Sequence, residues 1–289
     1  MTIRPAADPS STAAPAAPPA RPPLFAWSGD VAELHARIAP LVEAGMFVVR
    51  PDGRYELAPD AGTRTPFLFK AKPHDYQCFV WFHVLFERFG LVPSRCRDCY
   101  KTAVYPETLA QLLQLYAFQQ GYDHLAKCGA ELRDYVPGVY SGYFYHASRE
   151  AAAREHDAVR AAVLAAVDGP PPIVLKRACT EFGLAMDGEG DAASGAPVTS
   201  TAAAARAELE AAVTALFVTR AHLLDHDACS PDPAEKRLAW RLWVSWAARH
   251  HDPTLARCLG DPGPFTDHVL VDLPGPAADT PFVTVLPVG

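Results

Sequence analysis

Four cysteines with basic neighbours are the residues of this sequence whose types and spacing most clearly allow chemistry. Each has a Lys or Arg within two positions, and all lie between Arg95 and Glu181: Cys96, Cys99, Cys128 and Cys179. The first two form a Cys-x-x-Cys pair, and the other two stand alone. Thiolates are the preferred ligands of structural zinc and of iron–sulfur clusters. We therefore predict that the four thiols surround one metal centre.

The spacing of these cysteines bears on the kind of metal. The pair is followed after 28 residues by Cys128 and after a further 50 by Cys179. Zinc ribbons usually supply two close pairs, whereas one pair with two single cysteines fits an iron–sulfur cluster at least as well. We expect a [4Fe-4S] cluster, with zinc as the alternative. A third interpretation makes Cys96 and Cys99 a redox-active pair and leaves the other two as core thiols.

Charged and phenolic residues accompany the cysteines along the chain. A cluster held by four thiolates carries negative charge, which nearby cations offset, and the same cations can bind an anionic molecule. The predicted anion-binding residues are Lys101, Lys127, Arg133, Lys176 and Arg177. A carboxylate or tyrosine beside a metal can act as general acid or base, and the candidates are Glu131, Tyr143 and Glu181. The alternative for these polar residues is a solvated sheet face or an ion pair.

The composition of the chain limits the kinds of molecule that it is expected to bind. The chain has 289 residues, 49% of them hydrophobic, with a net charge of −7 and a pI near 5.9. The negative charge gives no general attraction to nucleic acid or to anionic membranes, so we expect a small anionic molecule or a protein as partner. Residues 1–23 are rich in Ala, Pro and Ser, which predicts a disordered tail without the apolar core of a secretory signal. We expect a cytoplasmic protein with reduced thiols.

The middle of the chain alternates strand-like and helical patterns. Ser148 can cap the second of two predicted helices, and Pro106 and Glu107 open the first. The expected segments are strands at 101–105, 126–136, 139–145 and 172–176, with helices at 107–121 and 149–166. The order β-α-β-β-α-β is that of the ferredoxin-like split βαβ sandwich. We predict an α+β fold with such a core at about residues 100–178.

This order predicts where the thiols meet. In such a sheet the first two strands run parallel to each other and antiparallel to the last two. Cys96 and Cys99 precede the first strand, Cys128 lies near the start of the second, and Cys179 follows the fourth. All four are therefore expected at one edge of the sheet.

The flanking segments predict accessory elements. A helix and a hairpin within 24–70 resemble the last part of a winged-helix module, which suggests a docking element. An aromatic helix at 75–89 ends at Gly90 and contains Cys78, which we interpret as a core residue. The expected divisions after this segment are a metal-binding core at 71–186, a linker at 187–203, a helical hairpin at 204–260 and a Pro-rich tail at 261–289.

Three functions follow from these patterns. The first is an iron–sulfur enzyme or accessory protein acting on a small anionic metabolite, as a metal- or thiol-dependent oxidoreductase or lyase. The second is a zinc-stabilised protein-interaction module, and the third is a thiol oxidoreductase using Cys96 and Cys99. His222, His226 and Cys229 also have residue types that suit a second metal site.

Overall fold

The computed structural model describes residues 25–58, 66–69, 75–133, 135–188, 200–218 and 233–261. The predicted tail at 1–23 and all but the first residue of the predicted tail at 261–289 lie outside these ranges, as do the middle of the linker and His222, His226 and Cys229. The described residues form a mixed α+β fold with two antiparallel sheets. None of their helices combines the length and the apolar character needed to cross a bilayer.

The larger sheet has five strands in the order β3-β5-β6-β4-β7, and each strand is antiparallel to its neighbours. The four strands predicted from the sequence are all present, although the second is shorter than expected. Their bounds are β4 (Tyr100–Val104), β5 (Ala126–Ala130), β6 (Tyr140–His146) and β7 (Ile173–Arg177). An unpredicted edge strand, β3 (Phe67–Phe69), pairs with β5.

Glycine is required where β3 meets β5. A Cβ atom at Gly129 would lie 2.0 Å from the carbonyl oxygen of Pro66, so only glycine allows this approach.

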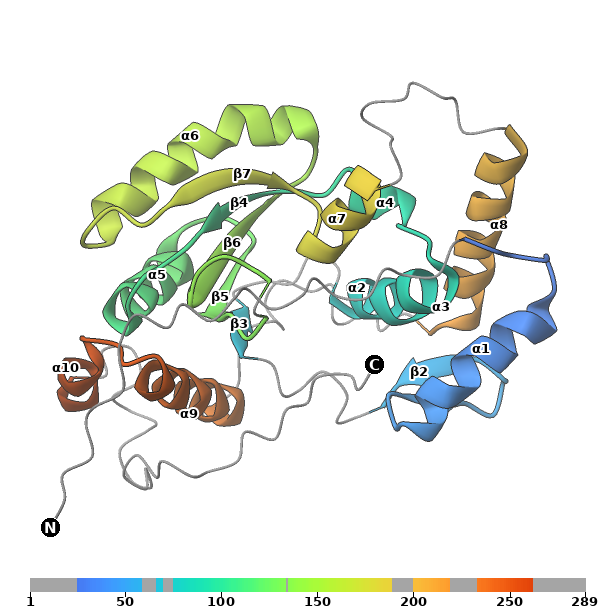
Figure 1. Ribbon diagram of the computed structural model, residues 1–289, viewed down its shortest axis with the longest axis horizontal. Helices are drawn as coiled ribbons and strands as arrows, with labels where there is room; N and C mark the ends of the chain where they lie inside the picture. Colours follow the sequence, from blue (N-terminus) through green and yellow to red (C-terminus); the bar gives the residue numbers. More distant parts are fainter. Residues whose placement is uncertain are drawn as a thin grey trace, which may run out of the picture.

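Two helices follow β4 and β6, and their starts are set by capping residues. The Thr108 hydroxyl accepts a hydrogen bond from the Gln111 amide at the start of α5 (Leu109–Gly121). The Ser148 hydroxyl accepts one from the Ala151 amide at the start of α6 (Arg149–Ala166). Such caps satisfy amides that have no partner within the helix. Both helices pack on the same face of the sheet (Figure 1).

The main apolar core lies between this sheet and its helices. Phe144 and Val104 from the sheet pack with Val163 of α6 and with Trp243 of α9 (Pro233–Arg249). The indole N–H of Trp243 donates to the Pro66 carbonyl at 2.6 Å, which ties α9 to the β3 edge. The short helix α10 (Leu255–Gly260) adds Cys258 to this core.

A second apolar cluster surrounds the N-terminal helix and hairpin. The predicted helix and hairpin are present as α1 (Val31–Glu43), β1 (Phe47–Val49) and β2 (Tyr55–Leu57). They pack with α8 (Ser200–Leu216) and with the predicted aromatic helix. That helix runs through α2 (Asp75–Val80), the π-helical η1 (Trp81–Phe86) and α3 (Glu87–Phe89), and it ends at Gly90 with φ +66°.

The predicted C-terminal helical hairpin is wrong. Leu209 and Val213 of α8 lie in the cluster around α1, whereas Trp240 and Trp243 of α9 lie in the cluster beneath the sheet. The two helices consequently lie on different sides of the molecule (Figure 1). Each apolar face is covered by elements that are distant in the sequence, which periodicity alone does not reveal.

Candidate functional site

The two faces of the five-stranded sheet differ in what they bury. The Thr102 hydroxyl of β4 lies 2.9 Å from Nδ1 of His156 on α6, within hydrogen-bond distance. The Thr102 side chain therefore lies on the face of the sheet that the helices cover. Since side chains alternate along a strand, its neighbour Lys101 lies on the opposite side. We call these the helical face and the polar face. Strand pairing places Tyr145 and Lys176 beside Lys101 on the polar face.

Lys101 is the most unusual residue of the polar face. It is 4% exposed, and its Nζ atom lies 3.5 Å from the Cys179 sulfur. The rings of Tyr143 and Tyr145 lie 5.3 and 5.7 Å from the ammonium. Within the described residues, Lys101 forms no ion pair with a carboxylate. A buried ammonium needs a compensating group, and here the nearest one is a thiol.

The ionisation of Lys101 depends on that thiol environment. Burial lowers the pKa of the ammonium, but Cys179 and Cys99 more than offset this effect, so the pKa is raised. The ammonium of Lys101 is thus stabilised to the extent that the neighbouring sulfurs carry negative charge.

Cys99 and Cys179 come together because β4 and β7 are neighbours. Cys99 immediately precedes β4, and Cys179 follows β7 by two residues. The Ala178 amide donates to the Cys99 carbonyl at 2.7 Å, which joins the two segments. Ala178 has a φ of +57°, a left-handed conformation that is unfavourable for a residue with a side chain. This turn leads from β7 into α7 (Thr180–Gly188) and places Cys179 beside Lys101.

Cys96 lies next to this pair. It belongs to the short helix α4 (Ser94–Arg97) and is buried against Val92 and Phe182. Burial is the main reason that the pKa values of Cys96 and Cys99 are raised. Three of the four cysteines predicted to share a site are thus brought together.

A cysteine that sequence reasoning assigned to the core joins this group. Cys78 of α2 is exposed, and it is close enough to Cys96 to add to the effect of burial in raising its pKa. It also contributes, after burial, Cys179 and Cys99, to the raised pKa of Tyr145. The aromatic residues around Cys78 in the sequence favoured a core interpretation. The spacing of the cysteines carried no signal to correct it.

The placement of Cys128 is a correction to the sequence prediction. Cys128 pairs with Gly142, which pairs with Val104, about 13 Å along β4 from the start of the strand. It is fully buried on the helical face. A Cβ atom added to Gly142 would lie 3.3 Å from the Cys128 Cβ and 2.5 Å from a Leu115 methyl of α5. The sheet therefore separates Cys128 from the other thiols.

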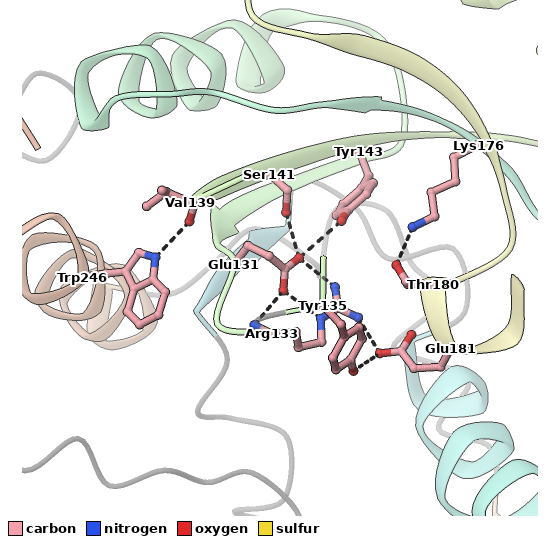
Figure 2. Close-up of polar contacts among 10 residues, drawn as sticks. All are labelled: Glu131, Arg133, Tyr135, Val139, Ser141, Tyr143, Lys176, Thr180, Glu181 and Trp246. Atoms are coloured by element: carbon pink, nitrogen blue, oxygen red, sulfur yellow. Dashed lines mark hydrogen bonds and ion pairs between the residues drawn. The ribbon is translucent and has the colours of Figure 1, made fainter. Parts of the chain in front are cut away.

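Two buried glutamates are joined by one arginine (Figure 2). Arg133 donates to both oxygens of Glu131, at 2.7 Å each, and to Glu181 at 2.8 Å. Glu131 also accepts from Ser141 at 3.2 Å and from Tyr143 at 3.5 Å. These hydrogen bonds compensate the burial of the Glu131 carboxylate. Glu131 and Arg133 therefore have a structural role in this network.

Glu181 completes this network from α7. Its carboxylate accepts a hydrogen bond from the Tyr135 hydroxyl at 2.6 Å. Burial raises the pKa of Glu181, but Arg133 and Tyr135 lower it by more, so the net pKa is below its usual value. Glu181 is therefore held as a carboxylate. The pKa of Tyr143 is raised to about 12, mainly by burial and then by Glu131.

The remaining predicted anion-binding residues are divided between the two faces. Lys127 lies over the ring of Tyr143 at 5.4 Å, on the polar face. Lys176 donates to the Thr180 hydroxyl, and its pKa is lowered by burial and by the charge of Lys101. Arg177 donates to the Arg97 carbonyl, and strand alternation places it on the other side of β7 from Lys176. Lys101, Lys127 and Lys176 thus share the polar face, and Arg177 does not.

The spacing of the thiols limits how they could hold a metal. In a tetrahedral zinc site, bonds of about 2.3 Å place the sulfurs roughly 3.8 Å apart. Among the described residues, no three cysteine sulfurs lie within 4.8 Å of one another. The site would have to contract to bind a single ion. A multi-iron cluster lies between its ligands and suits more widely spaced thiols.

No family model matches this chain, and comparison with curated proteins and with solved structures gives no significant match either. The residues of the polar face are therefore the basis on which a function can be proposed.

Proposed function

We propose that this chain is an iron–sulfur protein whose cluster is bound by Cys96, Cys99 and Cys179, with Cys78 as the fourth ligand in place of Cys128. The observation that carries this proposal is the burial of Lys101 with a thiol sulfur and, within the part of the chain that the structure describes, no carboxylate as its polar neighbour. Thiolates bound to iron would supply the negative charge that this ammonium needs. A donor hydrogen bond to a ligating sulfur is also a common way in which proteins tune a cluster.

Two alternatives remain in view. Zinc would require the sulfurs to move closer together than they are, as described above. A thiol oxidoreductase needs a cysteine with a lowered pKa, whereas burial raises the pKa values of Cys96 and Cys99. The geometry favours the cluster over both.

The polar face would bind a small anionic metabolite beside the cluster. Lys127 and Lys176 provide cationic groups near Lys101, and Glu131, Arg133 and Tyr143 form the fixed surroundings. Since Glu181 is a carboxylate next to this group, it is the candidate proton acceptor. Such a combination suits an oxidoreductase or lyase in the reducing cytoplasm.

We assign the core to the ferredoxin-like arrangement. Support comes from the order β5-β6-β4-β7, with all neighbours antiparallel, and from α5 and α6 as crossover helices on one face. In this assignment β3 is an addition at the edge.

Anaerobic purification of the full chain tests the proposal. We expect a brown protein that contains iron and acid-labile sulfide in similar amounts and that is bleached by dithionite. A colourless protein with stoichiometric zinc would support the interaction module instead. A protein with neither metal, and with a reactive Cys99, would support the thiol oxidoreductase.

A further inference from the structure

A second group of metal-ligating side chains lies on the helical face, on the other side of β4 from Lys101. His124 precedes β5, His146 ends β6, and Glu155 lies on α6. One ligand atom from each of these residues lies within 4.8 Å of the others. Among the described residues, this is the one trio of histidine, cysteine or carboxylate groups that converges so closely.

His146 is held in the orientation that a metal ligand requires. Its side chain is fully buried, and Nε2 lies 2.9 Å from the Thr102 hydroxyl, which also contacts His156. Its other nitrogen, Nδ1, lies 3.0 Å from a Glu155 oxygen. Metal-binding histidines are typically fixed in this way through the nitrogen that does not bind the ion. Thr102 therefore sets the direction in which Nδ1 points.

The other two members complete an accessible site. The His124 ring lies 5.2 Å from that of His146, at 66° between the ring planes. The Glu155 side chain is 40% exposed, so an ion can enter from solvent past the carboxylate. The site thus combines a buried ligand, His146, with a solvent-exposed ligand, Glu155.

We propose that His124, His146 and Glu155 bind a divalent transition-metal ion such as zinc or iron(II). Two imidazoles and one carboxylate suit these ions, and three protein ligands leave a coordination position open. With the ion on Nδ1, the single proton of the neutral His146 imidazole lies on Nε2, which donates it to the Thr102 hydroxyl. This proposal is independent of the thiol site, because Thr102 and Lys101 lie on opposite faces of β4.

Co²⁺ titration of the full chain tests this site. We expect the wild-type protein to bind an ion with nitrogen and oxygen ligands, detected by visible d–d absorption without a sulfur-to-cobalt charge-transfer band. His146→Ala and Glu155→Gln should weaken this binding at least about 100-fold, because even outer-shell changes cost about 10- to 100-fold. Thr102→Val, which removes only the orienting contact, should weaken it about 10-fold.

His83→Ala is the matched control. His83 pairs with Glu87 at 2.8 Å, but within the described residues no third ligand accompanies them. This variant should bind Co²⁺ as the wild type does. If His146→Ala binds as many ions with unchanged affinity, or if all cobalt bound by the wild type shows sulfur ligation, the proposal is wrong. Circular dichroism verifies that each variant is folded.

Failure of the iron–sulfur proposal would be seen separately. It would appear as an absence of iron and sulfide in the anaerobic protein, whereas the Co²⁺ test reports on nitrogen and oxygen ligands.

Discussion

On the helical face of the sheet, Ala126, Cys128 and Phe144 are buried against helices, while on the polar face Lys101, Glu131 and Tyr143 are buried equally well. The same strands contribute to both faces, because successive side chains along a strand point to opposite sides. One side is an apolar core, and the other holds buried charges and thiols. Burying apolar surface stabilises a fold, whereas burying charges costs free energy unless each charge is compensated. The burial of charges on the polar face therefore costs stability that the apolar burial on the helical face must offset.

The largest predicted effect concerns charge compensation on the polar face. Arg133→Ala leaves Glu131 and Glu181 buried without their cation, so we expect a loss of about 3 kcal/mol in unfolding free energy, measured by urea denaturation. The control is Arg50→Ala, which removes a partly exposed pair with Glu56 and should cost less than about 1 kcal/mol. Similar losses for the two variants would contradict the account of the polar face.

A smaller effect is expected from filling space on the helical face. An alanine methyl at position 142 would lie 2.5 Å from Leu115, so Gly142→Ala should destabilise the protein by about 1–3 kcal/mol. The same change at Gly183 of α7 meets no atom within 4 Å and should stabilise it by about 0.5–1 kcal/mol. Thermal unfolding of both variants shows whether each substitution raises or lowers the melting temperature. If Gly142→Ala is neutral, the helical face is less tightly packed than described.

The smallest effect is a pH dependence that comes from Glu181. Its pKa is lowered in the folded state, so its contribution to stability is present above the unfolded value of 4.5 and is lost as the pH falls through the folded pKa. The difference in unfolding free energy between wild type and Glu181→Gln should therefore shrink below pH 4.5. Glu107→Gln, at an exposed position, serves as control. A difference that stays constant with pH would show that the Glu181 charge is not stabilised by folding.

Local features of the fold were predictable because they depend on neighbouring residues. The cap at Ser148, the helix end at Gly90 and the four strands of the core were all found from short patterns. The strand β3 was not found, because its three residues form a strand only through pairing with β5.

The candidate site was predictable only in part. Strand order correctly indicated that Cys99 and Cys179 meet at one edge of the sheet. It did not assign faces, and a shift of one residue along a strand moves a side chain to the other face. For this reason Cys128 was assigned to the thiols although it lies on the helical face. The place of Cys78 depends on how a distant helix packs, which no spacing pattern encodes.

We propose that the thiols of the polar face, and not the thiol of the helical face, bind an iron–sulfur cluster. The most direct test is the iron and acid-labile sulfide content of Cys179→Ala and Cys128→Ala, each purified anaerobically beside the wild type. We predict that Cys179→Ala loses the cluster and its visible absorbance, while Cys128→Ala retains both. Loss of the cluster in Cys128→Ala with retention in Cys179→Ala, or no iron in the wild type, would contradict the account.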